Sequence, residues 1–335
     1  ITRQRFKRII KNCGGALSVQ LRMDLGSRHI RIACLEKNIS YTDSAVVALD
    51  ASNRIAASGV AAKKLRQRDN VRLAYPIHEG CVVSEELAET LFRQIAAKAG
   101  VSWNRSKLLL ATSLSLNSGD KAVLEGIFNR LGVKQTIFRE GVTADFRLAQ
   151  RLYGVTEGVI VNVGAGCSEI ALLRGDSIVN GCSLYLAGNA IDAAIQKYAE
   201  FQKGVRISAE EAEAVKMNCG SLYSNDMSVY TASGVSAKTG EAASVTIAAR
   251  EIYDTVEELT IRITDVVKSL MNSIPNSDEC EVFLTGGSSY LQGLDSFVEQ
   301  QLQRNITVLP DPDESTLNGL KLMPAEKEEK SGKGF

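Results

Sequence analysis

The sequence lacks closely spaced metal-ligating residues. It has only two histidines, and it contains no CxxC pair. Seven cysteines are scattered along it: Cys13, Cys34, Cys81, Cys167, Cys182, Cys219 and Cys280. A structural zinc site normally needs clustered cysteine and histidine ligands, and a disulfide framework is typical of short secreted chains. We therefore interpret the cysteines as free thiols of a protein in a reducing, cytoplasmic compartment.

Net charge and long apolar runs are also missing. The chain carries 39 basic and 39 acidic residues, without the basic excess of a general nucleic-acid binder, so no nucleic-acid partner is expected. The longest apolar stretches, such as 107–111 and 159–163, are too short to span a bilayer. With 335 residues, of which 44% are hydrophobic, the chain is long enough for two domains or one large bilobal unit.

The two ends of the sequence have unusual composition. Residues 1–12 hold several basic and no acidic side chains, with apolar residues at roughly helical spacing. This segment is interpreted either as a basic amphipathic element on a membrane surface or as a solvated arm, and both interpretations stay open. Residues 326–335 are mostly charged residues and glycine, which predicts a disordered tail.

One strand–glycine–strand pattern occurs twice, and Asp24 and Asn162 hold equivalent places in the two copies. Such duplication predicts two similar α/β lobes that face each other across a cleft. Hydrophobic periodicity predicts strands at 108–112, 134–138, 159–163 and 281–284. It also predicts helices at 85–99, 121–131, 144–152, 188–201, 208–217 and 245–274, and from 288 or 289 onward.

Three glycine-containing turns follow short hydrophobic strands: DLGS at 24–27, NVGAG at 162–166 and LTGG at 284–287. Glycine allows backbone N–H groups to approach an anion closely, and the third turn is expected to open a helix whose N-terminus also favours an anion. The sequence contains neither a P-loop nor a dinucleotide-binding glycine motif. The turns predict a nucleotide clamp, with Asp24 either as an outer-sphere partner of Mg²⁺ or as a turn cap.

In this order the turns resemble the phosphate-1, phosphate-2 and adenosine motifs of the actin-like ATPases. Residues 75–80, 186–192 and 212–216 also resemble segments of the bacterial MreB branch, and within it the chain is most similar to MamK-type magnetosome filament proteins. The resemblance covers roughly residues 21–323. It implies an α/β actin-like ATPase fold, with duplicated ribonuclease-H-like lobes and four subdomains around a nucleotide cleft.

The resemblance also implies a domain organisation. A basic arm at 1–20 precedes lobe I at 21–155, into which a subdomain is inserted at about 52–82. Lobe II follows at 156–310, with an insertion at about 189–244. A C-terminal helix within 311–325 returns to lobe I, ahead of the tail at 326–335.

The implied ligand is ATP or ADP with Mg²⁺. Asp24 would hold the metal, and the phosphates would lie between the two lobes against Gly26, Ser27, Gly164, Ala165, Gly166 and Ser168. The adenosine would contact Glu213, Lys216, Gly286, Gly287 and Ser288. Glu140 would help to position the attacking water, and Asn162 occupies the catalytic place at the start of the phosphate-2 motif.

The sequence departs from the family at places that affect hydrolysis. The phosphate-2 motif usually begins with Asp, whereas this chain has Asn162, which brings no charge to Mg²⁺ and cannot act as a base. Gly141 replaces the proline after Glu140, and residues 118–121 lack a glutamate that MreB proteins offer near the γ-phosphate. Because loss of a general base costs about 10²- to 10⁴-fold in rate, nucleotide binding is expected to survive better than hydrolysis.

These features predict an actin-like cytoskeletal protein that binds ATP–Mg²⁺, hydrolyses it slowly and polymerises with itself. The filaments would organise organelles, as magnetosome-type filaments do, or determine cell shape. Two alternatives stay open, because a shared fold does not decide function. One is a small-molecule kinase or phosphatase of the same superfold, and the other is a nucleotide-binding adaptor that does not polymerise.

Overall fold

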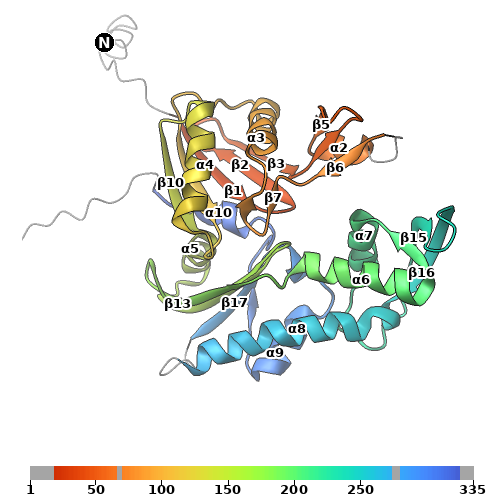
Figure 1. Cartoon of the computed structure of the whole chain (residues 1–335). Coiled ribbons are helices and arrows are strands. Elements are labelled where there is room, and N and C mark those ends of the chain that lie inside the picture. The colour runs from red at the N-terminus through yellow and green to blue at the C-terminus, as the bar shows by residue number, and fades with distance from the viewer. Residues whose placement is uncertain (1–18, 66–69, 274–279, 325–335) are drawn as a thin grey trace, which may run out of the picture.

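Two five-stranded sheets form the centres of two α/β lobes, shown one above the other in Figure 1. The computed structural model describes residues 19–65, 70–273 and 280–324. The first sheet has the order β10-β9-β1-β2-β3. Its strands are β1 (Gln20–Leu25), β2 (His29–Cys34), β3 (Ile39–Ser44), β9 (Lys107–Thr112) and β10 (Gln135–Glu140).

The second sheet repeats this topology in the order β18-β17-β11-β12-β13. Its strands are β11 (Glu157–Val163), β12 (Ser168–Arg174), β13 (Ser177–Leu184), β17 (Glu281–Thr285) and β18 (Thr307–Val308). In both sheets the first strand pairs antiparallel with the next strand of its hairpin and parallel with a strand from later in the chain. The predicted duplication is therefore confirmed, and Asp24 and Asn162 lie at matching positions.

Helices cover both faces of the first sheet. They are α3 (Glu85–Ala99) and α4 (Ser118–Leu131) on one face, and α5 (Gly141–Tyr153) and α10 (Ser315–Lys321) on the other. Side chains of β9 alternate between these layers: Leu108 and Leu110 pack with the α3–α4 core, whereas Leu109 and Ala111 pack with Ala144 of α5. Both faces of the strand are buried, which explains its continuous apolar sequence.

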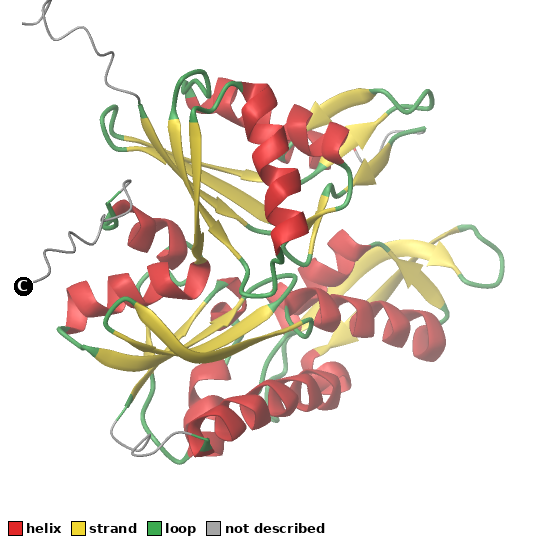
Figure 2. Ribbon diagram, turned by 60° about the vertical axis from the view of Figure 1, so that its left-hand side comes forward, coloured by secondary structure: helices red, strands yellow, loops and turns green. Residues whose placement is uncertain are grey.

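Helix α5 lies between the two sheets, as Figure 2 shows from the side. Its residues Val142, Phe146 and Ala149 pack against Ile160 and Phe283 of the second sheet. The helix therefore contributes to the cores of both lobes. Substitutions on one face of α5 should destabilise the packing of the first sheet, and substitutions on the other face should destabilise the packing of the second.

Helices α6 (Gly188–Lys203), α8 (Ala249–Asn272) and α9 (Leu294–Leu302) pack on the second lobe. The helix predicted from residue 245 was wrong at its start, because β16 (Ala242–Ala248) extends to Ala248 and pairs with β15 (Val229–Ser236). Val245 and Ile247 are buried and the residues beside them are less so, which is the period of a strand. Residue 274 lies outside the described residues.

The continuous helix predicted from residue 288 or 289 onward was also wrong. Residues Gly287–Tyr290 form one short 3₁₀ helix, η2, and α9 begins only at Leu294. Gly293 stands between the two helices with a φ of 76°, a left-handed conformation that interrupts a continuous helix.

Two small sheets extend the lobes on the same side of the molecule (Figure 1). One contains β4 (Val47–Leu49), β5 (Ile55–Ser58) and β6 (Arg72–Ala74), with α2 (Val60–Leu65) beside them. The other contains β14 (Val205–Ile207), β15 and β16, with α7 (Ala209–Cys219) packed on them. A short hairpin of β7 (Ile77–His78) and β8 (Cys81–Val82) follows the first small sheet.

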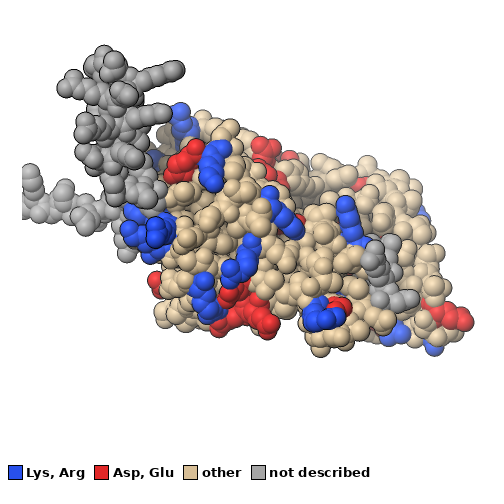
Figure 3. Space-filling view, turned by 90° about the horizontal axis from the view of Figure 1, so that it is seen from above, with Lys and Arg blue, Asp and Glu red and all other residues tan. Residues whose placement is uncertain are grey.

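The face seen from above in Figure 3 shows basic and acidic side chains interspersed where grey atoms do not cover it. Within the described residues, no helix combines the length and apolar character needed to cross a membrane. The predicted basic arm, apart from its last two residues, and the predicted tail lie outside the described residues.

Candidate functional site: the cleft between the lobes

A cavity of about 430 Å³ opens between the two lobes, which is within the size range of small-molecule sites. The three glycine turns meet in its wall. Twelve of the predicted site residues line it: Asp24, Gly26, Ser27, Asn162, Gly164, Ala165, Gly166, Glu213, Lys216, Gly286, Gly287 and Ser288. The duplicated hairpins thus bring residues from distant parts of the sequence to one cavity.

The first two turns have the same backbone geometry. The Gly26 N–H donates to the His29 carbonyl at 3.1 Å, and the Gly164 N–H donates to the Cys167 carbonyl at 3.1 Å. A Cβ on Gly26 would lie 2.6 Å from the carbonyl oxygen that its own N–H contacts, so a larger residue cannot keep this turn. A Cβ on Gly164 would lie 3.0 Å from the Cys167 carbonyl oxygen, so the steric limit is strict at Gly26 and weaker at Gly164.

The two turns also approach each other across the cleft. A Cβ on Gly166 would overlap the present position of the Ser27 hydroxyl oxygen and lie 3.1 Å from the Glu79 Cα, so the lobes approach closely at this glycine. The third turn docks on the second, because Ser288 Oγ donates to the Gly164 carbonyl at 2.9 Å. All three turns therefore form one continuous loop surface.

Asp24 is paired with an arginine that lies opposite it in the β1–β2 register. Arg31 Nη1 lies 3.3 Å from Asp24 Oδ2, and Arg31 Nη2 lies 3.0 Å from Asp313 Oδ2. Burial raises the pKa of the Asp24 carboxyl, and the Arg31 charge opposes this shift. The sequence analysis did not identify Arg31, although the hairpin register alone places it beside Asp24.

Asn162 directs its amide nitrogen toward a fully buried carboxylate. Asn162 Nδ2 donates to Asp145 Oδ2 at 2.7 Å, and Asp145 belongs to α5. Burial raises the pKa of Asp145 to about 7, against the hydrogen bonds of Ser315, Asn162 and Thr316 that favour the ionised form. Asp145 was not identified from the sequence, because nothing in its local pattern points to the cleft.

Glu169 lines the cleft wall, and sequence reasoning missed it as well. It lies opposite Asn162 in the β11–β12 register. Its Oε1 accepts hydrogen bonds from Ser113 Oγ at 2.8 Å and from the Leu114 N–H at 2.5 Å. Because Ser113 and Leu114 follow β9, this carboxylate connects the second sheet with the first lobe.

Two predicted site residues do not line the cavity. Glu140 ends β10, its side chain is about one-third exposed, and its carboxylate lies 3.7 Å from Lys121 Nζ. Ser168 is fully buried, and its hydroxyl donates to the Leu186 carbonyl at 2.5 Å. In this conformation neither side chain is directed to the space where a phosphate would lie.

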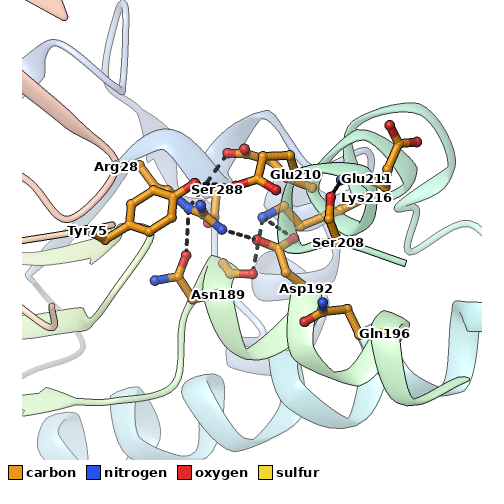
Figure 4. Close-up of polar contacts among 12 residues, drawn as sticks. Arg28, Tyr75, Asn189, Asp192, Gln196, Ser208, Glu210, Glu211, Lys216 and Ser288 are labelled. Atoms are coloured by element: carbon orange, nitrogen blue, oxygen red, sulfur yellow. Dashed lines mark hydrogen bonds and ion pairs between the residues drawn. The ribbon is translucent and has the colours of Figure 1, made fainter. Parts of the chain in front are cut away.

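A cross-cleft network joins the lobes around Asp192 and Lys216 (Figure 4). Its members are Lys63, Arg28 and Tyr75 from the first lobe, and Asn189, Asp192, Glu210, Glu213 and Lys216 from the second. Arg28 lies 3.2 Å from Asp192 and donates to Asn189 at 3.0 Å. Lys216 Nζ lies 2.8 Å from Asp192 as well. Both lobes therefore share one buried carboxylate.

Comparison with known proteins assigns the chain to a protein family. The family model "MreB/Mbl protein" matches residues 18–332. The chain belongs to the MreB/Mbl family. It is an actin-like cytoskeletal protein, as the resemblance of its motifs implied.

Its relatives in this family are distant in sequence. The cell shape-determining protein Mbl of Bacillus subtilis is 22% identical over 305 residues, which cover 87% of this chain and 91% of Mbl. MreB of Escherichia coli K12 is 22% identical over 322 residues, which cover 91% of this chain and 92% of MreB. Both relatives are matched along nearly their whole length.

Solved structures share the fold. MreB5 of Spiroplasma citri bound to AMPPNP superposes with a TM-score of 0.84 at 21% identity, covering 91% of this chain and 96% of MreB5. The MamK double helical filament gives a TM-score of 0.77 at 19% identity, covering 90% of this chain and 98% of MamK. The predicted actin-like fold of the MreB branch is thereby confirmed.

Proposed function

We propose that this MreB/Mbl family member binds ATP or ADP with Mg²⁺ between lobe I (21–155) and lobe II (156–310). The observation that carries the proposal is the convergence of two matching glycine turns, one from each lobe, at the Ser27–Gly166 contact. Backbone N–H groups in such turns are suited to the oxygens of a polyphosphate. The AMPPNP-bound and ADP-bound structures of MreB5 support a nucleotide as the ligand.

The cleft fits a hydrated Mg²⁺ that accompanies the nucleotide. Mg²⁺ usually keeps several waters and uses one or two carboxylates together with substrate phosphates. Asp24 provides such a carboxylate in the wall of the cleft. Bound there, the metal would neutralise phosphate charge, while Arg31 holds Asp24 in place.

Hydrolysis is proposed to be slow. Asn162 is neutral and cannot take a proton, and Glu140 lies outside the cavity lining. Glu169, which does line the cavity, has burial as the main cause of its raised pKa and already accepts three hydrogen bonds. None of these groups is a free base directed at the space between the turns.

The proposed cellular function is a homopolymeric filament that organises organelles or cell shape. A head-to-tail contact between identical subunits does not close on itself and so builds a filament. The MamK double helical filament supports this assembly for the fold. We propose a cytoplasmic location, and membrane attachment through residues 1–12 is a further hypothesis that liposome flotation with and without this segment would test.

The proposal is tested by equilibrium binding of AMPPNP with Mg²⁺, followed by negative-stain microscopy of the same sample. We expect saturable binding and filaments for the unaltered chain. Gly166→Val should weaken binding at least tenfold, because its side chain would occupy the contact with Ser27. Gly126→Ala in α4 is the matched control, since its Cβ meets only Arg130 at 3.7 Å. Binding without filaments would favour an adaptor, and phosphoryl transfer to sugars would favour a kinase.

A further inference from the structure

Asp145 is a buried carboxylate to which the proposed function assigns no part. It lies on α5 behind strand β11, and its side chain is fully buried. Its Oδ1 accepts hydrogen bonds from Ser315 Oγ at 2.7 Å and from Thr316 Oγ1 at 2.9 Å, both at the start of α10. Its Oδ2 accepts the Asn162 amide, at 2.7 Å. One oxygen therefore holds α10, and the other holds a residue of the cleft.

The hydroxyl groups of this cluster determine which of its atoms donate hydrogen bonds and which accept them. Thr316 Oγ1 donates to Asp145 Oδ1, and Ser315 Oγ can donate to the same oxygen when it accepts the proton of Thr285 Oγ1. When Asp145 is ionised both of its oxygens accept, and it requires the amide nitrogen of Asn162 on its side. The planar amide then leaves Asn162 Oδ1 on the other side, next to Gly286 and Gly164 of the cleft wall.

We propose that Asp145 is a positioning residue, which orients Asn162 so that the second turn presents a hydrogen-bond acceptor to the cleft. This inference rests on the proposed nucleotide site. An acceptor at this position attracts the water shell of a cation and disfavours a bare phosphate oxygen. The chain thereby keeps an acceptor at the start of the second turn although it lacks an acid there.

The exchange Asp145→Asn should reverse this orientation without removing a side chain. The carbonyl oxygen of the new amide would stay toward the hydroxyls of Ser315 and Thr316, because both hydroxyls donate. The NH₂ group of the new amide would then face Asn162, which must turn its own oxygen inward to accept. The Asn162 nitrogen would point into the cleft as a donor.

Exchanging both residues provides a second, independent variant. In Asp145→Asn with Asn162→Asp, the new amide at position 145 donates to one oxygen of the new carboxylate at position 162. The other oxygen of that carboxylate faces the cleft. The hydrogen-bond pattern inside the protein is unchanged, while the cleft receives a charged acceptor. The unaltered chain therefore presents a neutral acceptor to the cleft. The single variant presents a donor there, and the double variant presents a charged acceptor.

The experiment measures the affinity of the full chain for ADP with Mg²⁺ and again with EDTA, at pH 8 where Asp145 is mostly ionised. It uses the ratio of the two affinities. We expect the ratio to fall about tenfold in Asp145→Asn and to rise about tenfold in the double variant. Asp265→Asn, an exposed residue of α8, is the control for the same chemical change and should leave the ratio unaltered. Thermal unfolding of each variant establishes that it is folded.

The possible outcomes separate this inference from the proposed function. If the unaltered chain binds no ADP under either condition, the nucleotide site itself is contradicted, and with it the inference. If it binds ADP and the ratio is the same in all folded variants, Asp145 is structural only and the inference is overturned. A ratio that falls in the single variant and rises in the double variant supports it, because a general loss of packing would lower both affinities together.

Discussion

The two hairpins of the duplicated unit share their backbone but differ in the charges at their ends. In the first lobe Asp24 faces Arg31 across the hairpin, whereas in the second lobe Asn162 faces Glu169 at the matching register position. The acid thus stands on the first strand of one hairpin and on the second strand of the other. In the first hairpin an arginine compensates the acid, but in the second no cation contacts Glu169 among the described ion pairs.

This difference indicates that the two halves of the cleft have different electrostatic functions. The first hairpin holds an ion pair, in which Arg31 also reaches Asp313. The second holds Glu169 in hydrogen bonds with the neutral groups of Ser113 and Leu114. Its Asn162 contacts Asp145 of α5, whose other hydrogen bonds in the described part of the chain come from the neutral hydroxyls of Ser315 and Thr316. The two lobes therefore share a backbone topology, but they compensate a buried carboxylate by different means.

The largest effect is expected when an acid is restored at the second hairpin alone. Asn162→Asp would put two carboxylates where a 2.7 Å hydrogen bond now exists, leaving an uncompensated buried charge. We expect a loss of about 3 kcal/mol in the free energy of unfolding, measured by denaturant titration at pH 8. The double variant with Asp145→Asn should recover most of it. Equal stability of the single and double variants would contradict the shared-carboxylate arrangement.

Removing the cation of the first hairpin is expected to have the next largest effect. Arg31→Met leaves Asp24, which is mostly buried, without its counter-charge. The unfolding free energy should fall by about 2 kcal/mol, and affinity for AMPPNP should fall as well. Arg54→Met is the control, since Arg54 forms a comparable pair with Asp50 at an exposed position. Equal losses in the two variants would argue against a special environment at Asp24.

Buried Asp145 should make stability depend on pH. Its pKa of about 7 in the folded protein lies above the ordinary value of 3.8, so the folded state holds a proton that the unfolded state has lost between these limits. Stability should therefore fall as pH rises from about 4 to 7, by at most about 1.4 kcal/mol per unit from this group. Denaturant titrations across this range would measure the slope, which should diminish in Asp145→Asn. An unchanged slope in the variant would assign the dependence to other groups.

Removing the charge of Glu169 should affect stability less than removing the charge of Arg31. Glu169→Gln can keep an acceptor oxygen for Ser113 and Leu114, because both contacts involve a single oxygen. We expect a change below about 1 kcal/mol in the unfolding free energy, in contrast to Arg31→Met. A loss as large as that of Arg31→Met would mean that the negative charge itself joins the lobes.

Much of the fold could be predicted from local patterns. The apolar run from Leu108 to Leu110 and the glycine turns at 24–27 and 162–166 identified both sheets and their duplication. The start of helix α8 could not be predicted in this way, because Val245 fits the apolar face of a helix as well as that of a strand. Only the pairing of β16 with β15 decides between the two. The prediction of a continuous helix after Gly287 was wrong because Gly293 adopts a left-handed conformation.

The site residues were predictable where a glycine turn directly after a strand identifies them in the sequence. Gly26, Gly164 and Gly286 line the cleft as expected. Arg31 and Glu169 were missed because their position depends on hairpin register, and Asp145 because it acts from a helix behind the strand. Arg31 could have been found from the hairpin register alone, whereas Asp145 becomes visible only when tertiary contacts are known.

The most direct test of the central claim is a reconstruction of the protein assembled with AMPPNP and Mg²⁺. We predict a filament of head-to-tail subunits in which nucleotide density lies between the turns at 24–27 and 164–166, with the third turn at 286–288 beside it. Filaments with an empty cleft, or a nucleotide bound anywhere else, would contradict the proposal that the two glycine turns form the site.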